Sequence, residues 1–354
     1  MKIAVLPGDG IGPEITAATL EVLKAADRRF ALGMEWESHA VGLAALKSVG
    51  TTAPEGLFDA CRRADGILLG PLDQVAYPPK VEGGINVSGE LRVRLDLYAN
   101  IRPSRSRPGL PHWGRTPMDL VIVRENTEGF YSDRNMHLGV GEFMPTADMA
   151  LSVRKITAQA SRRIAQSGFE MARRRRRKVT AVHKANVIKM SEALFLREAR
   201  AVAAQFPEVK YEEQLVDSMA ALLVRDAARF DVVVTTNMFG DILSDEAAEL
   251  SGSLGLGAAI NAGAGHCMAQ AQHGSAPDIA GQGIANPASL ILSAAMLLEW
   301  LGARHGRSAF TEAASAIEGA VDHLLQRAET RTRDLGGSLG TQAFAAAVAA
   351  RVAP

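Results

Sequence analysis

The segment DVVVTTNMFGDILSDEAAEL, residues 231–250, joins an apolar run directly to a helical stretch. A strand that leads straight into a helix is the repeating unit of sheets with parallel strands. Asp241 and Asp245 are one helical turn apart, so both carboxylates project from one face near the start of the helix. The segment predicts an α/β unit that presents two carboxylates where a strand reaches the edge of its sheet.

The same alternation of short apolar runs and helical stretches extends along the chain, which places the protein in the α/β class. Further strands are expected at 2–6, 66–69, 120–124 and 178–182, and helices at about 13–28 and 191–205. Helices should therefore pack on both faces of a parallel or mixed sheet. From Asn286 onward the chain is almost wholly helical, and Gly302 is expected to end the first of these helices. The buried face of that helix is marked by apolar residues at helical spacing, namely Leu290, Leu292, Met296, Leu297 and Leu301.

The composition limits the classes of partner. Thirty-nine basic side chains balance 39 acidic ones in 354 residues, so no overall field favours nucleic acid or an anionic membrane. Six consecutive cations at 173–178 lack interleaved aromatic residues, and we predict a solvated helix end there. Cys61 and Cys267 are too isolated for a disulfide framework. With no signal-peptide pattern and no long apolar run, the sequence favours a cytoplasmic protein outside the membrane.

Three arginines are candidate ligands for an anionic substrate. Arg92 and Arg102 flank LDLYAN, and Arg124 follows another strand. A guanidinium group binds a planar carboxylate through two parallel hydrogen bonds. Each arginine alone is more often a surface ion-pair partner. Together with Asp241 and Asp245, whose hard oxygen ligands suit Mg²⁺ or Mn²⁺, they indicate a site for a polyanionic acid chelated to a cation.

Tyr131 and Lys184 are candidate proton carriers. Neighbouring cations would lower the pKa of both side chains and so favour proton transfer. The alternative for each is a structural hydrogen bond. Asp217, which closes the run VKYEEQLVD, is a third carboxylate of the kind that a metal site recruits.

The segment HGSAPDIAGQGIANP, residues 273–287, has the glycines and prolines of a tight ligand-binding loop. Asp278 could accept hydrogen bonds from both ribose hydroxyls but would repel a 2'-phosphate, which favours NAD over NADP. The chain has no GxGxxG motif after a strand, because PGDGIGPE at 7–14 is a different pattern. An ordinary Rossmann domain is therefore not expected.

These motifs together make the chain resemble the β-decarboxylating dehydrogenases, the family of isocitrate, homoisocitrate, 3-isopropylmalate and tartrate or D-malate dehydrogenases. The likeness covers nearly the whole chain and runs through PGDGIGPE, LDLYANIRP, RENTEGFYS, VHKANVIK, NMFGDILSD, HGSAPDIAGQGIANP and DLGGSLGT. The resemblance implies an isocitrate/isopropylmalate dehydrogenase-like fold with two subdomains. A large nucleotide-binding domain would comprise 1–98 and 251–354, and a small domain, 99–250, would carry the contacts of a homodimer.

The resemblance also implies residue roles. The substrate, a di- or tricarboxylic hydroxy acid, would be bound by Ser88, Arg92, Arg102 and Arg124. Mg²⁺ or Mn²⁺ would be held by Asp217, Asp241 and Asp245. The NAD site would be lined by Asn186, His273, Gly274, Ser275, Ala276, Asp278, Ile279, Ala285 and Asn286. Tyr131 and Lys184 would be the acid/base pair, with Lys184 and Asp217 lent to the neighbouring subunit. The reaction implied is oxidation of a 2-hydroxy acid followed by loss of the adjacent carboxylate as CO₂.

The sequence departs from the family pattern at two places. Gln270, followed by Ala271 and Gln272, replaces the usual Glu before the nucleotide loop, and altered NAD affinity is expected. Ser88 and Gly89, with Asn86 before them, stand where isopropylmalate enzymes have a leucine pair. Burying a branched alkyl group there would forfeit about 1–2 kcal/mol of apolar contact, so an isocitrate- or homoisocitrate-like substrate is favoured.

Other functions stay open at this point. Arg94 and Lys80 could serve a third substrate carboxylate, although a surface position is an equal interpretation for both. The alternatives in substrate are 3-isopropylmalate and tartrate or D-malate. A non-catalytic regulatory subunit is a remote alternative, since the metal aspartates, Tyr131 and Lys184 are all present.

Overall fold

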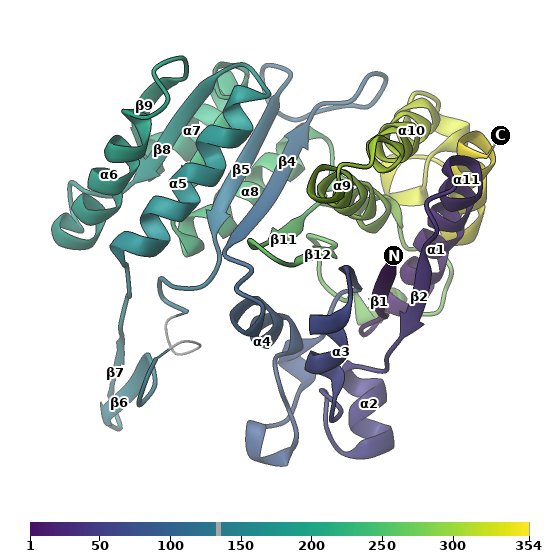
Figure 1. Ribbon diagram of the computed structural model, residues 1–354, viewed down its shortest axis with the longest axis horizontal. Coiled ribbons are helices and arrows are strands. Elements are labelled where there is room, and N and C mark those ends of the chain that lie inside the picture. Colours follow the sequence, from purple (N-terminus) through teal and green to yellow (C-terminus); the bar gives the residue numbers. More distant parts are fainter. Residues whose placement is uncertain (132–135, 354) are drawn as a thin grey trace.

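The computed structural model describes residues 1–131 and 136–353 and is organised around one ten-stranded sheet (Figure 1). The strand order is β2-β1-β3-β12-β11-β4-β5-β10-β8-β9. These strands are β1 (Lys2–Leu6), β2 (Glu35–Ser38), β3 (Gly66–Leu69), β4 (Ala99–Arg105), β5 (Asp119–Glu125), β8 (Lys178–His183), β9 (Lys210–Leu215), β10 (Val232–Thr235), β11 (Ile260–Ala262) and β12 (Cys267–Gln270). A separate hairpin joins β6 (Glu142–Thr146) to β7 (Met149–Ser152).

The sheet consists of two parallel halves joined by an antiparallel centre. Strands β2, β1, β3 and β12 run parallel, as do β5, β10, β8 and β9. Between the halves, β12, β11, β4 and β5 pair antiparallel. All four residues of β3 and of β10 are buried, as expected of parallel strands covered on both faces.

Helices cover both faces of the sheet, which confirms the predicted α/β class with a mixed sheet (Figure 1). They are α1 (Gly12–Phe30), α2 (Gly42–Val49), α3 (Leu57–Arg63), α4 (Val87–Arg94), α5 (Ala158–Arg173), α6 (Lys189–Ala203), α7 (Val216–Asp226), α8 (Asn237–Ser251), α9 (Ala288–His305), α10 (Ser308–Leu325) and α11 (Thr341–Val352). None of the helices in the described ranges is both long and apolar enough to cross a membrane.

Strand β5 shows how the two faces are covered. Leu120 and Ile122 belong to the core that contains Leu243 of α8, whereas Val121 and Val123 belong to the core that contains residues of α5. The alternation follows from the two-residue period of a strand. Helices α8 and α5 therefore lie on opposite faces of the same strands, and only the α8 face meets the candidate active site described below.

Within residues 1–131 and 136–353 the buried apolar side chains form four clusters, which follow the two halves of the sheet. Two clusters are drawn from 3–97 and 256–352 together with Leu110. The other two are drawn from 99–247. Each half of the sheet thus has its own apolar cores.

The end of α9 corrects one sequence prediction. The helix continues through Gly302 to His305, and Gly306 ends it in the left-handed conformation with φ of 62°. Gly302 is instead a packing residue, because a Cβ there would lie 2.8 Å from Oγ1 of Thr311 on α10. Leu290, Leu292, Leu297 and Leu301 are buried as predicted, whereas Met296 is only partly buried.

The basic run at the end of α5 is held by the protein itself. Arg175 forms ion pairs with Asp119 and Asp231, and Lys178 pairs with Glu212. These contacts anchor the end of the helix to acidic residues of the neighbouring elements.

Candidate active site

Two aspartates of α8 and two arginines of the central strands form one cluster. Nη1 of Arg102, on β4, donates to Oδ1 of Asp241 at 3.1 Å and to Oδ1 of Asp245 at 3.2 Å. Arg124, at the end of β5, donates to the same oxygen of Asp241. Gly240 permits this approach, since a Cβ there would lie 2.7 Å from Cβ of Arg124. The structure therefore brings together four of the residues that the sequence singled out.

Asn237 fixes the orientation of Arg124. Its Oδ1 accepts hydrogen bonds from Nε and Nη2 of Arg124, at 3.0 and 2.6 Å, and its Nδ2 donates to the backbone oxygen of Glu128 at 3.0 Å. Cζ of Arg124 lies 6.0 Å from the ring centre of Tyr131, so this tyrosine also belongs to the cluster. Sequence reasoning missed Asn237, although its place as the first residue of α8 after a buried strand was an available signal.

Arg92 and Ser88 meet at Gln270. Both residues are on α4, and Oε1 of Gln270 accepts from Oγ of Ser88 at 3.1 Å and from Nη2 of Arg92 at 3.3 Å. Arg92 and Gln270 border a cavity of about 100 Å³, whose lining also includes Asn100, Arg102, Asn261, Gln272, His273 and Gly274. Gln270 thus contacts the residues predicted to bind substrate, in addition to preceding the nucleotide loop. Asn86 has another role, because its side chain caps α4 by accepting from the backbone N–H of Gly89 at 2.8 Å.

Lys184 and Asp217 form a second, separate group. Nζ of Lys184 donates to Oδ1 of Asp217 at 2.7 Å, and this hydrogen bond holds the pKa of the carboxyl group below its usual range. Asn186 is exposed in the turn just after Lys184 and not in the nucleotide loop. Among the described residues, no three His, Cys, Asp or Glu side chains are grouped to hold a metal ion. One chain therefore does not gather Asp217 with Asp241 and Asp245.

The loop predicted to bind a nucleotide is held by the N-terminal glycine turn. The backbone N–H of Ile11 donates to the oxygen of Ser275 at 2.8 Å, and a Cβ on Gly10 would lie 2.0 Å from that oxygen. Oε2 of Glu14 accepts from the N–H of Gly283 at 3.0 Å. The turn in PGDGIGPE thus acts as a support for the loop.

The residues predicted to bind the nucleotide differ in their exposure to solvent. Gly274 and Asp278 are exposed, whereas Ser275, Ala285 and Asn286 are buried, and Ala276 and Ile279 are intermediate. Burial lowers the pKa of His273, so its imidazole is neutral near pH 7. Asn286 is engaged by the fold, because its Nδ2 donates to Oδ2 of Asp334 at 2.9 Å.

Asp9, within PGDG, is a structural residue that the sequence analysis did not single out. Its carboxylate accepts from the backbone N–H groups of Leu43 and Asp73, at 2.7 and 3.0 Å, and from the hydroxyl of Tyr77 at 2.5 Å. These contacts tie the N-terminal glycine turn to the start of α2 and to the segment that follows β3. Their partners lie 34 to 68 residues away, so no local pattern marks them.

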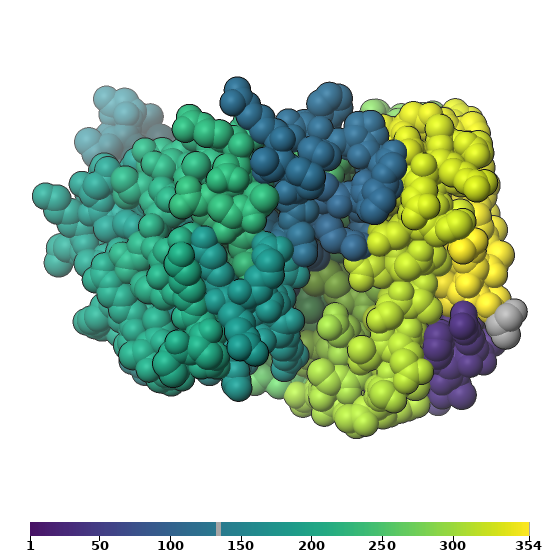
Figure 2. Space-filling view, turned by 90° about the horizontal axis from the view of Figure 1, so that it is seen from above, coloured from purple at the N-terminus to yellow at the C-terminus, as the bar shows by residue number. Residues whose placement is uncertain are grey.

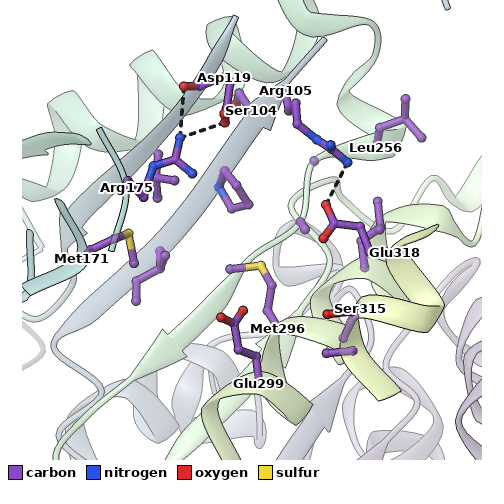
Figure 3. A pocket seen from close by; sticks show the side chains of 18 of the residues that line it. Ser104, Arg105, Asp119, Met171, Arg175, Leu256, Met296, Glu299, Ser315 and Glu318 are labelled. Atoms are coloured by element: carbon purple, nitrogen blue, oxygen red, sulfur yellow. Dashed lines mark hydrogen bonds and ion pairs between the residues drawn. The ribbon is translucent and has the colours of Figure 1, made fainter. Parts of the chain in front are cut away.

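A larger cavity, of about 490 Å³, lies on the other face of β4 (Figure 3). Arg175 and Asp119 lie on one wall, and Met296, Glu299 and Ser315 lie on the other. The space-filling view shows the hollow between the teal middle of the chain and the yellow-green region of α9 and α10 (Figure 2). None of the predicted site residues lines it. We therefore place the chemistry at the smaller polar cavity, where titratable and cationic groups converge.

The arrangement suits an anionic ligand bound with a divalent cation. Asp241 and Asp245 supply hard carboxylate oxygens one helical turn apart, and Arg102 and Arg124 are fixed beside them. The arginines offset the mutual repulsion of the two carboxylates and can also bind planar acid groups. The side chains present thus fit Mg²⁺ or Mn²⁺, with room for ligands from outside this chain.

Comparison with known proteins gives a consistent result. The family model described as isocitrate/isopropylmalate dehydrogenase matches residues 2–348. A 3-isopropylmalate dehydrogenase of Archaeoglobus fulgidus is 40% identical over 98% of both chains, and an isocitrate/homoisocitrate dehydrogenase of Thermus thermophilus is 42% identical over 98% of this chain and 97% of its own. The crystal structure of isocitrate dehydrogenase from Methylococcus capsulatus superposes with a TM-score of 0.88 at 39% identity, covering 100% and 99% of the two chains. The chain belongs to the isocitrate/isopropylmalate dehydrogenase family.

Proposed function

We propose that the protein catalyses NAD-dependent oxidative decarboxylation of a malate substituted at C3, assisted by Mg²⁺ or Mn²⁺. Family membership makes it an oxidoreductase that decarboxylates a hydroxy acid. The observation that carries the finer proposal is the cluster of Arg102, Arg124, Asp241 and Asp245. Neither a plain hydride transfer nor a regulatory subunit would require two carboxylates positioned beside two buried arginines.

The proposed roles follow from the contacts. Arg102 and Arg124 bind the malate carboxylates, and Arg92 binds the same anion from α4. Asp241 and Asp245 would hold the cation, which would supply a Lewis acid for the developing negative charge. The loop of residues 273–287 would hold NAD, which would supply the hydride acceptor. Tyr131, beside Arg124, donates the proton that the C3 carbon requires after CO₂ has left.

We propose a homodimer in which Lys184 and Asp217 of one subunit complete the site of the other. What supports this is their position as a separate, partly exposed pair away from the arginine cluster. Lys184 would take the hydroxyl proton, and Asp217 would be the third carboxylate for the cation. The hydrogen bond from Lys184 holds the pKa of Asp217 below its usual range, which favours the ionised carboxylate that a cation would require.

We also propose that 1–98 with 251–354 and 99–250 behave as two domains. The segregation of the apolar clusters supports this division. The candidate active site draws Arg102, Arg124, Asp241 and Asp245 from the second unit and Ser88, Arg92 and Gln270 from the first, so closure of the two would complete it. The exposed carboxylate of Asp278 supports NAD as the dinucleotide, because it would repel the 2'-phosphate of NADP. The thiols of Cys61 and Cys267 are buried and form no disulfide, which supports a cytoplasmic location.

We take 3-isopropylmalate as the first substrate to test. Relatives from Archaeoglobus fulgidus and Methanothermobacter thermautotrophicus carry the name 3-isopropylmalate dehydrogenase, which favours this alternative over an isocitrate-like substrate. Lys80 and Arg94 support it too, because both pair with Glu90 on the surface and Arg94 also stacks on Phe58. Both side chains thus contact Glu90, and we do not assign them to a third carboxylate of the substrate.

Isocitrate or homoisocitrate is the second candidate. The polar contact between Ser88 and Gln270 favours it, because the Gln270 amide that lines the smaller cavity is polar, whereas an alkyl group would need apolar side chains there. The relative from Thermus thermophilus carries both of these substrates in its name.

A panel of substrates tests the proposal. NADH production is measured with Mn²⁺ and, in turn, 3-isopropylmalate, isocitrate, homoisocitrate, D-malate and tartrate, and repeated with NADP. We expect turnover with CO₂ release for one 3-substituted malate and a preference for NAD. NADH formation without CO₂, or no turnover with any of the five acids, would refute the proposed reaction.

A further inference from the structure

Gln272 connects the nucleotide loop to the cation carboxylate Asp245. It follows β12 and directly precedes His273, the first residue of the loop. Its Nε2 donates to Oδ1 of Asp245 at 2.8 Å, and Nη1 of Arg102 donates to the same oxygen at 3.2 Å. One oxygen of this carboxylate is therefore held by two donors, one neutral and one cationic.

Gln272 is positioned by its backbone and by the space that its side chain occupies. A carboxylate can only accept a hydrogen bond at neutral pH, so Nε2 and not Oε1 must point toward Asp245. The backbone N–H of Gln272 donates to Oγ of Ser289 at 3.3 Å. Gly257 leaves room for the side chain, because a Cβ at that position would lie 2.7 Å from Oε1 and 3.0 Å from Cδ of Gln272. The glycine has a φ of −66°, so space for Gln272, and not backbone conformation, is what an alanine there would disturb.

We propose that Gln272 is a positioning residue that sets the orientation of Asp245 for the divalent cation and couples cation binding to dinucleotide binding. The inference rests on the proposed function. Asp245 is half exposed and, with Arg102 alone, could adopt several rotamers. A second donor on Oδ1 restricts it and turns its other oxygen toward incoming ligands. Because Gln272 is uncharged, it orients the carboxylate without competing for it as a lysine would.

The coupling follows from the position of Gln272 in the chain. Any ligand that orders the loop from His273 onward also restrains the backbone of its neighbour, and thereby the amide on Asp245. Occupancy of the dinucleotide loop should therefore tighten cation binding, and the reverse must hold to the same factor.

The experiment measures Mn²⁺ binding to the intact protein without substrate. Free Mn²⁺ is followed by electron paramagnetic resonance, with and without NAD. In the Gln272→Met variant, which keeps the side-chain size but removes the donor, we expect Kd for Mn²⁺ to rise about tenfold. The effect of NAD on that Kd should disappear. The matched control is Gln166→Met, since Nε2 of Gln166 also donates to a carboxylate at 2.8 Å, that of Glu170 on the surface of α5.

A second variant disturbs the contact between Gln272 and Asp245 without changing either residue. Gly257→Ala should displace the amide and weaken Mn²⁺ binding by a similar factor, and in the Gln272→Met background it should add no further loss. Unchanged Mn²⁺ binding in both single variants would overturn the inference while leaving the proposed function intact. If the wild-type protein itself bound no Mn²⁺, the proposed function would fail instead. Thermal unfolding of each variant separates these outcomes from loss of the fold.

Discussion

The two faces of β4 carry arginine–carboxylate clusters of opposite design. Arg102 points to the α8 face and Arg105, three residues later, points to the cavity on the other face. On the first face the side chains of Arg102 and Arg124 are 8% and 3% exposed, while those of Asp241 and Asp245 are 36% and 51% exposed. The cations are fixed inside the protein, and the anions are open to a ligand.

On the other face one acid is enclosed together with its arginines. Asp322 of α10 is 21% exposed and is enclosed by Arg105 and Arg107, the latter only 8% exposed. Arg105 also reaches Glu318 at 2.9 Å, as the dashed line in Figure 3 shows. Both oxygens of Asp322 are committed to arginines, so this cluster joins β4 to α10 and offers little to a ligand. The same pair of residue types thus makes a binding site where the acid is accessible and a structural link where it is enclosed.

The largest effect is expected from Asp241→Asn on the α8 face. The change removes a cation ligand and the shared partner of Arg102 and Arg124, so kcat/KM with the best substrate should fall by about a thousandfold or more. Steady-state NADH production at saturating Mn²⁺ measures the loss. The matched control is Asp322→Asn on the other face, which should retain kcat. If Asp241→Asn kept more than a tenth of the activity, the distinction between the two clusters would be wrong.

Asp322→Asn should instead act on stability. Arg107 is buried, and the loss of its partner's charge leaves an uncompensated cation, which costs about 3 kcal/mol of the free energy of unfolding. Burial also lowers the pKa of Arg107, which shows that Asp322 offsets an unfavourable environment. Urea denaturation measures the change. A wild-type unfolding midpoint in this variant would mean that the link between β4 and α10 contributes nothing.

A pH effect is expected from Glu128, whose backbone oxygen accepts from Asn237 of α8 and whose carboxylate contacts Thr157, the N-cap of α5. Burial raises the pKa of Glu128 to about 7, although Thr157 donates to its carboxylate through the backbone N–H and the hydroxyl. Because the folded-state value lies above the unfolded value of 4.5, the protonated form favours folding. This contribution to stability is fully present below pH 4.5 and is lost as pH rises from 4.5 to about 7. Above that pH it causes no further change.

In the Glu128→Gln variant this loss of stability with rising pH should be absent. We expect the wild-type free energy of unfolding to fall by about 2 kcal/mol more than that of the variant between pH 4.5 and pH 7.5. Denaturation curves at several pH values provide the measurement. Parallel curves for the two proteins would show that Glu128 is ionised throughout.

Most of the fold was predictable from the sequence, because strands and helices have local periods. The exception at Gly302 is instructive. A glycine that ends a helix and a glycine that admits a neighbouring helix look alike in sequence, and only the approach of Thr311 distinguishes them. The antiparallel centre of the sheet likewise depends on pairing between β4 and β11, which are 160 residues apart and carry no local signal.

The active-site cluster was predictable for a related reason. Arg124 lies at the end of the buried strand β5 and Asp241 lies near the start of α8, which follows β10, and such positions mark residues at the sheet edge. Gln272 was noted only as part of a departure from the family pattern, and its contact with Asp245 required the fold. The separation of Asp217 from the other aspartates was implied by the resemblance to a family with shared sites and not by the residues themselves.

The smallest effect should come from Glu318→Gln, which tests whether the second cluster depends on enclosure or on the number of charges. Glu318 contacts the same arginine as Asp322, but its side chain is 51% exposed, and water and salt screen its charge. Its loss should cost less than about 1 kcal/mol, since Asp322 continues to hold Arg105. Glu312→Gln, an exposed change on the same helix, sets the baseline for the denaturation measurement. If Glu318→Gln cost as much as Asp322→Asn, then every acid facing Arg105 would contribute equally, and exposure would not be what separates a binding carboxylate from a structural one.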